Sequence, residues 1–263
     1  MGIMKSVAKY LIIILLFTSG CSKQESFEPI ASDIEITMVE TIDSTGRTFQ
    51  LKCETKEHYP CANYKLVSRL NKVSNSYEID FNGIDIPGVC LTAFGPALAN
   101  IELGNPANGV YDIVITTDET INSGKLYVST DHYILDFDQT GRIGFTNHIL
   151  NRVPENTIWG TIGYHNSDTK PLAEEFIESL KNLGAETRSY LPGNYGYFSI
   201  SSKGEIEPPE NHGNYFIDAF ILEYTGKSGN LKDIVRNYRL NYNDRLKILL
   251  YTTEGDMFRS WAQ

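Results

Sequence analysis

Apolar and polar residues alternate over most of the first 150 positions of the chain. In Tyr77–Phe81 and in Tyr111–Ile115, apolar residues recur at every second position. This alternation is typical of β-strands that turn one face to a core. Turn-forming pairs such as Asn82-Gly83 and Asn108-Gly109 separate the segments. Strands are therefore expected at 33–42, 48–55, 62–70, 76–82, 97–103, 110–117, 125–130, 133–137 and 142–145.

Short strands at this spacing predict an antiparallel β-sandwich over residues 33–150. No helical period of convincing length precedes residue 145. The region resembles the Ig-like or transthyretin-like modules of envelope lipoproteins. That resemblance concerns architecture alone and implies no functional residue.

The pattern changes after a polar stretch at 148–157, where Pro154 marks the expected domain boundary. Beyond it, Leu172, Phe176 and Leu180 recur at helical spacing, and Gly184 supplies a C-terminal stop. A second helix is expected over 230–239. Strands are expected at 157–164, at 185–190 or 195–200, at 215–224 and at 245–252.

This order of strands and helices, β-α-β-β-α-β, resembles the ferredoxin-like fold over residues 156–263. That fold is an antiparallel sheet with both helices on one face. Right-handed crossovers would place the first and last strands side by side in the centre. The fold hosts many functions and by itself implies none.

The N-terminal segment has the pattern of a secretory signal. Lys5 and Lys9 precede an apolar run, Leu11–Phe17, which small and polar residues follow. The run is too short for a spanning helix, which needs about 20 apolar residues. The ending Thr18-Ser19-Gly20-Cys21 resembles the lipobox of bacterial lipoproteins, in which Leu usually stands at the place of Thr18.

The lipobox resemblance implies that residues 1–21 form the signal and that Cys21 carries a diacylglycerol. The remaining chain would then be an outer-membrane or surface lipoprotein of a bacterial cell envelope, held to the membrane by its acyl chains. Residues 22–32 would be a tether. Loss of Lys5 and Lys9 changes the net charge from −10 to about −12. An acidic surface excludes nucleic acid as an expected partner.

The expected pairing of the cysteines depends on this assignment. With Cys21 given to lipid, Cys53, Cys61 and Cys90 remain, and an odd number allows at most one bridge within the chain. Cys53 continues an inward-facing alternation and is expected to be a buried thiol. Cys61 and Cys90 lie beside Pro and Gly loop residues, so the expected disulfide is Cys61–Cys90, with Cys53–Cys61 as the alternative.

Asp136 and Asp138 form the first candidate for chemistry. Their stretch, Tyr133–Gly141, resembles the first motif of haloacid-dehalogenase phosphatases. The resemblance implies Asp136 as nucleophile and Asp138 as general acid, but it requires an α/β sheet. The stretch also partly fits a calcium loop, although Asn147 stands where a bidentate Glu is needed. A hairpin turn explains it without chemistry, so no metal or cofactor is expected.

Two further segments resemble catalytic motifs. Thr225–Ser228 lies between a strand and a helix, as a phosphate-binding loop would, but Ile221 stands where that loop needs a glycine. Glu205, Glu207 and Glu210 flank a Pro-Pro pair and are the acids available to a hydrolase. Helix capping and solvation, respectively, explain the two segments without chemistry.

Aromatic residues are the strongest candidates for binding. Trp159, Tyr190, Tyr195 and Tyr197 lie with Gly and Asn residues in the second half of the chain. Rigid aromatics with such neighbours suit a peptide- or sugar-binding surface. The alternative is that they are strand residues that pack a small core.

These features predict a non-catalytic envelope lipoprotein that binds a protein or glycan partner. The alternative is a secreted hydrolase of glycan, peptide or phosphate ester that uses the acidic residues above. A third possibility is a structural subunit or inhibitor whose sheet edge pairs with a partner strand.

Overall fold

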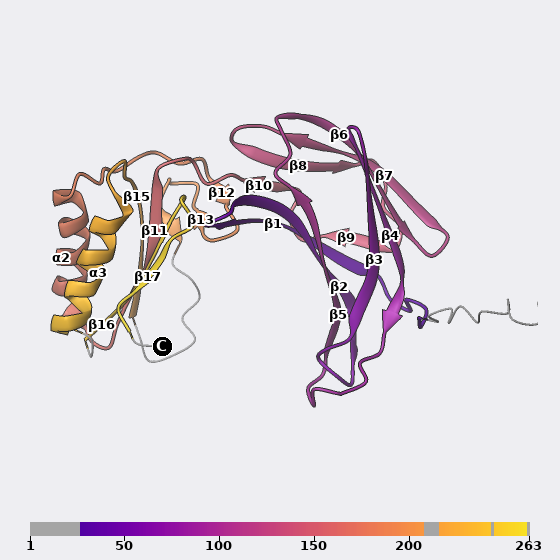
Figure 1. Ribbon diagram of the computed structural model, residues 1–263, viewed down its shortest axis with the longest axis horizontal. Helices are drawn as coiled ribbons and strands as arrows, with labels where there is room; N and C mark the ends of the chain where they lie inside the picture. The colour runs from indigo at the N-terminus through magenta and orange to yellow at the C-terminus, as the bar shows by residue number, and fades with distance from the viewer. Residues whose placement is uncertain (1–26, 208–215, 243–244, 262–263) are drawn as a thin grey trace, which may run out of the picture.

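A computed structural model describes residues 27–207, 216–242 and 245–261 (Figure 1). Cys21 and the signal segment lie outside these residues. The described chain is mainly β, with two α-helices packed together at one end of the molecule. None of the helices in the described part is long and apolar enough to cross a membrane.

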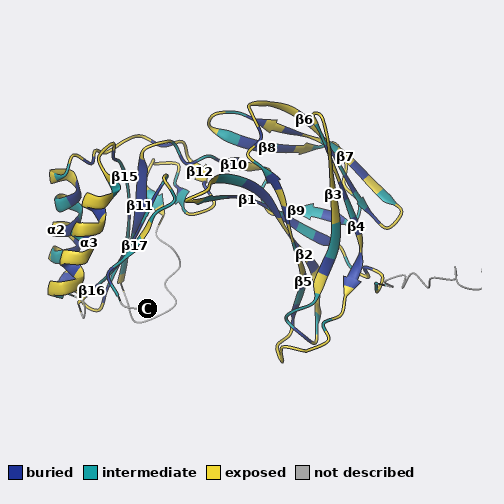
Figure 2. Ribbon diagram, viewed as in Figure 1, coloured by how far each residue is buried: buried dark blue, intermediate teal, exposed yellow. Residues whose placement is uncertain are grey.

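The first part of the chain forms ten strands, nine of them close to the expected positions and the tenth, 149–151, in the stretch expected to be a domain boundary. The alternation that predicted them is also the burial pattern that they show, with buried and exposed residues in turn (Figure 2). The strands are β1 (Ile34–Asp43), β2 (Gly46–Tyr59), β3 (Lys65–Val73), β4 (Ser76–Asp85), β5 (Gly95–Gly104), β6 (Gly109–Thr117), β7 (Thr120–Val128), β8 (His132–Phe137), β9 (Ile143–Phe145) and β10 (Ile149–Asn151).

The predicted antiparallel β-sandwich is wrong. All ten strands belong to one mixed sheet, in the order β10-β8-β7-β6-β4-β3-β5-β2-β1-β9. The strands β4 and β6 pair in parallel, as do β1 and β9. A single sheet can bury its alternating apolar residues by curling around them, so alternation alone does not distinguish it from two stacked sheets.

Irregular pairings accompany the curl of this sheet into a half-barrel (Figure 1). The register of β2 against β5 shifts after Phe49 and again after Glu54, and that of β3 against β4 shifts after Val67. Such bulges bend a strand and increase its twist. The core lies inside the curl and comes from inward residues of nearly every strand. Its largest fully buried side chains include Tyr77, Tyr133 and Phe49.

The two ends of the sheet meet along the segment 143–151. Its first half pairs with β1, and Thr146 N donates to Ile36 O at 3.0 Å. Its second half pairs with β8 through β10. Between them the Asn147 side chain bonds both backbone groups of Met38, at 2.9 and 3.3 Å. The edges of the half-barrel are therefore partly covered by the same short segment.

The last part of the chain forms a four-stranded antiparallel sheet, ordered β15-β11-β16-β17, with both helices on one face (Figure 1). Its core joins the helices to alternate residues of the sheet, among them Phe176, Ile162 and Ile248. The elements are β11 (Thr157–Tyr164), α2 (Lys170–Asn182), β15 (Phe216–Glu223), α3 (Ser228–Tyr242), β16 (Leu246–Thr252) and β17 (Met257–Arg259).

The predicted ferredoxin-like fold is also wrong, although β11 and β16 do lie side by side in the centre. The strand expected after the first helix is missing from the sheet, where 185–190 contributes only the bridge Glu186↔Glu223. The following Pro- and Gly-rich stretch instead forms a separate three-stranded sheet of two-residue strands. They are β12 (Gly193–Asn194), β13 (Ser199–Ile200) and β14 (Ile206–Glu207).

Candidate functional site

An aromatic cluster joins the half-barrel to the second sheet. Trp159 projects from the face of β11 that carries no helix, and it is 3% exposed. The segment 190–207, which contains the three-stranded sheet and is called the lobe below, packs against Trp159 through Tyr190, Tyr195 and Ile200. Val153, from the connection to the half-barrel, belongs to the same cluster. The lobe thus covers a sheet face that would otherwise expose an indole to water.

This arrangement places the four aromatic residues singled out in the sequence in one region. Tyr190 and Tyr195 are buried with Trp159 inside the cluster, whereas Tyr197 remains 37% exposed. The two buried tyrosines pack edge to face, with ring centroids 6.5 Å apart. Of these four aromatic residues, Trp159 and Tyr197 line an open pocket.

The pocket has a volume of about 490 Å³ and lies between the lobe and the second sheet. This volume falls within the usual range for small-ligand sites, about 300–1,000 Å³. The sheet supplies Trp159, Thr161, Ala219, Leu249 and Tyr251 to its lining. The lobe supplies Asn194, Gly196, Tyr197, Phe198, Ser199, Ile206 and Glu207.

Four aromatic side chains among the described residues line the pocket, and three of them, Trp159, Tyr197 and Tyr251, pack against one another. Trp159 stacks on Tyr251 with a centroid distance of 5.7 Å and an interplanar angle of 15°. Tyr197 lies 5.1 Å from Trp159 and 6.1 Å from Tyr251. Each ring therefore holds the other two in place, and the apolar wall is formed before any ligand arrives.

The polar groups of the pocket are few and almost all uncharged. Thr161, Asn194 and Ser199 offer hydroxyl and amide groups, and Glu207 is the one ionisable carboxylate among the described lining residues. No lysine or arginine lines it within the described part of the chain. The buried Nε1 of Trp159 has no hydrogen-bond partner among the described residues.

Tyr197 links the pocket to the half-barrel. The backbone N–H of Ile42, near the end of β1, donates to the Tyr197 hydroxyl at 2.7 Å. Burial raises the pKa of Tyr197, so the group stays a neutral phenol with its own proton left to donate. The half-barrel thereby fixes the ring that carries the most exposed aromatic surface of the site.

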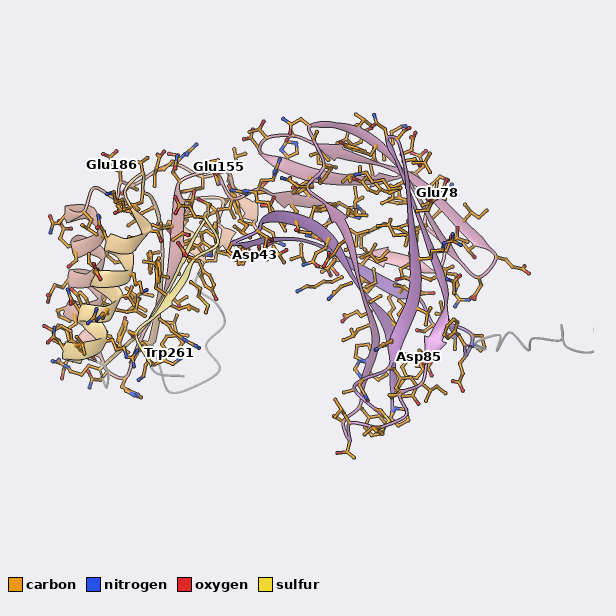
Figure 3. All side chains as sticks on the ribbon, viewed as in Figure 1. Asp43, Glu78, Asp85, Glu155, Glu186 and Trp261 are labelled. Atoms are coloured by element: carbon orange, nitrogen blue, oxygen red, sulfur yellow. A yellow bond between two sulfur atoms is a disulfide. The ribbon has the colours of Figure 1, made fainter. Side chains whose placement is uncertain are left out.

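Glycine permits the close packing that shapes the sheet below the pocket. A Cβ on Gly160 would lie 1.9 Å from the carbonyl oxygen of Leu249 and 2.8 Å from the Phe220 ring. At the junction, a Cβ on Gly255 would lie 2.0 Å from the backbone of Asp43. Figure 3 shows Asp43 and Glu155 at this junction, where the turn after β1 approaches the second sheet.

The structure does not bring Asp136 and Asp138 into a site. Both are exposed at the end of β8 in the antiparallel surroundings of β7 and β10. Asn147 is engaged with the β1 backbone. No cluster of metal-ligating side chains occurs within the described ranges.

The strand-to-helix turn at 225–228 is occupied by its own contacts. The Tyr224 hydroxyl donates to Lys227 O at 3.2 Å, and a Cβ on Gly226 would lie 2.3 Å from that hydroxyl. The Ser228 hydroxyl donates to the Asp256 carboxylate. The adjoining cavity measures about 10 Å³. It is too small for a phosphate, and the carboxylate would repel one.

Of the acidic loop, Glu205 and Glu207 are exposed, and Glu210 lies outside the described residues. Glu207 alone of the two lines the pocket. A glycoside hydrolase needs two carboxyl groups across its cleft, about 5–10 Å apart. The described lining supplies only one.

The predicted disulfide is present. Cys61 and Cys90 are bonded, and Cys53 is a free, buried thiol on β2. Burial raises the pKa of Cys53 to about 12, so the thiol stays neutral and unreactive in the folded protein.

Sequence reasoning missed Tyr251, which completes the ring triad. The signal was available in the last strand, where Leu246, Ile248 and Leu250 face the helices. The alternate residues Leu249 and Tyr251 must then face the other side, next to Trp159.

Comparisons of the chain with protein-family models, with curated proteins and with solved structures found no match, so the functional argument depends on the residues of the pocket.

Proposed function

We propose that this chain is an envelope lipoprotein that binds an uncharged oligosaccharide in the pocket formed by Trp159, Tyr197 and Tyr251. The observation that carries the proposal is the preformed ring triad, to which the sheet supplies Trp159 and Tyr251 and the lobe supplies Tyr197, together with the Thr, Asn and Ser groups of the lining. A pyranose has an apolar face of C–H groups and a rim of hydroxyls, and both find counterparts here.

Charge argues for a neutral ligand. The chain carries a formal net charge of −10, and Glu207 is the one charged side chain in the described lining. An anionic sugar or a phosphate would meet no cation among the described lining residues and would approach an acidic protein.

Binding is favoured over hydrolysis because the described lining residues include one carboxylate, whereas hydrolysis of a glycoside needs one as acid and another as base or nucleophile. The lipoprotein assignment is supported by the lipobox-like sequence ending at Cys21 and by the disulfide. Disulfides persist mainly in oxidising compartments outside the cytoplasm.

The test is a glycan array probed with the purified chain, followed by titration of each hit with tryptophan fluorescence as the readout. Tyr197→Ala should weaken binding at least tenfold, because it removes an aromatic contact surface. Tyr127→Ala is the matched control, since Tyr127 has the same exposed fraction, 37%, but lies on β7 of the half-barrel.

Tyr197→Phe keeps the ring and loses only the hydroxyl that accepts from Ile42. It should retain most of the affinity if stacking on the ring is the main contribution. The proposal fails if the array shows no neutral glycan. It also fails if Tyr197→Ala binds the hits as tightly as Tyr127→Ala does.

A further inference from the structure

The loop between β4 and β5 displays an unusual amount of apolar surface. Val89 and Phe94 are 79% and 78% exposed, which are the highest values among the large apolar side chains of the described chain. Leu91 and Ile86 are exposed as well. The nine residues 86–94 include no charged side chain, in a chain with 56 Lys, Arg, Asp and Glu residues (23 plus 33).

This loop is held in shape despite its exposure. The disulfide ties Cys90 to Cys61 in the segment after β2. Asn63 clamps the same turn, since its Nδ2 donates to Val89 O at 2.7 Å and its Oδ1 accepts from Leu91 N at 3.1 Å. The apolar side chains between these bonds are therefore presented on a fixed backbone, which lowers the entropy lost when a partner covers them.

The loop also lies where the chain enters the folded part. Glu28 and Ile84 exchange two backbone hydrogen bonds, at 3.0 and 2.8 Å, and the loop begins two residues after Ile84. Figure 3 labels Asp85, which lies between this bridge and the loop. Six residue steps separate Cys21 from Phe27. Fully extended, they span about 20 Å at most.

We infer that the loop 86–94 docks on the surface of the lipid bilayer, with Val89, Leu91 and Phe94 inserted at the level of the headgroups. This inference rests on the lipid anchor proposed for Cys21, because the short tether would keep the entry point, and with it the loop, close to the membrane. Apolar and aromatic side chains on a polar scaffold favour this interfacial layer. An uncharged loop also avoids the cost of bringing carboxylates against lipid.

The test uses the full chain, purified from expressing bacteria and reconstituted in phosphatidylcholine vesicles with or without brominated acyl chains. Phe94→Trp places a fluorophore in the loop, and Leu240→Trp is the matched control. Leu240 is 71% exposed but lies on α3, at the other end of the molecule (Figure 1). The fluorescence of the parent chain, from Trp159 and Trp261, is subtracted from both variants.

Bromolipid should quench at least half of the added fluorescence in Phe94→Trp and leave that of Leu240→Trp unchanged. Val89→Trp offers a second probe of the same loop in case the first variant does not fold. Equal quenching of the loop and control probes overturns the inference, and a loop that binds a protein partner instead would give that result.

Flotation and the mass of the N-terminal peptide separate the two proposals. A chain without diacylglycerol that still floats and shows loop quenching refutes the anchor and leaves the docking intact. A chain that carries the lipid but shows no loop quenching supports the anchor and refutes the docking of the loop. A chain that does not float overturns the docking.

Discussion

Glu40 is the most deeply buried charged side chain described in the molecule, at 1% exposed. It continues the inward alternation of β1, so its carboxylate points into the half-barrel. Arg47 approaches one oxygen at 2.9 Å. Arg152 Nε and the Tyr133 hydroxyl approach the other at 3.3 and 2.9 Å. A second ion pair joins Arg47 Nη2 to Glu155 Oε1 at 3.3 Å and extends the network to the junction.

Glu40→Gln keeps the shape of the side chain and removes its charge. One of the two carboxylate oxygens becomes an amide that donates, and it then faces a guanidinium or hydroxyl donor. Two nearly buried guanidiniums lose their main counter-charge. Removal of one partner from a buried ion pair costs about 3–5 kcal/mol. With a urea slope of about 2–3 kcal/mol per molar, the unfolding midpoint should fall by about 1–2.5 M.

Urea unfolding followed by tryptophan fluorescence measures this change. The control is Asp112→Asn, which removes the partner of Lys125 in an ion pair of 2.7 Å between two half-exposed side chains. Such a surface pair contributes about 0–1 kcal/mol. If Glu40→Gln shifted the midpoint no more than Asp112→Asn did, then Arg47 and Arg152 would be compensated by water, and the network would not stabilise the fold as argued.

Two further predictions concern the cysteines. Replacing both Cys61 and Cys90 by Ala should lower the free energy of unfolding by about 3–4 kcal/mol, by the loop-entropy estimate for a separation of 29 residues. Equal unfolding midpoints for this variant and the parent, both without reductant, would contradict it. Cys53 has an ordinary pKa of 9.0, raised to about 12 by burial. From about pH 9 to 12 the unfolded chain therefore loses a proton that the folded chain keeps, and stability falls as pH rises. Against Cys53→Ala, the parent should lose about 1.4 kcal/mol more per pH unit in this window. Parallel pH profiles of the two proteins would refute the buried thiol.

The sequence predicted where strands lie much better than how they pair. Alternation is a local property, and strands such as β4 and β6 follow it closely. The pairing of β1 with β9 joins Ile34 to Ile143, more than a hundred residues apart, and nothing in either strand specifies it. The bulges that accompany the curl fall inside long strands, where the apolar pattern merely weakens. A sandwich and a curled sheet therefore remain equivalent until long-range pairing is known.

The sequence predicted which aromatic residues form the candidate site but not which of them are buried and which are exposed. Rigid aromatics and glycines near residues 190–198 marked the lobe, and Trp159 marked the sheet beneath it. Their separation into buried and exposed rings depends on the lobe folding back over β11, because the 185–207 stretch fails to form the expected strand. Only then is Tyr197 left facing the pocket while Tyr195 is buried.

The half-barrel lies between the pocket region and the disulfide-bonded loop. At one end of β2, Arg47 forms an ion pair with Glu155, and at the other end Tyr59 leads into the disulfide loop. The fourteen residues of β2 correspond to about 40–45 Å along the strand. If the loop rests on lipid as inferred, that contour length is an upper bound on the rise of β2 from the bilayer, because two bulges bend the strand. A polysaccharide that extends from the membrane could reach a pocket raised in this way, whereas the preference for a neutral ligand follows from the almost entirely uncharged lining.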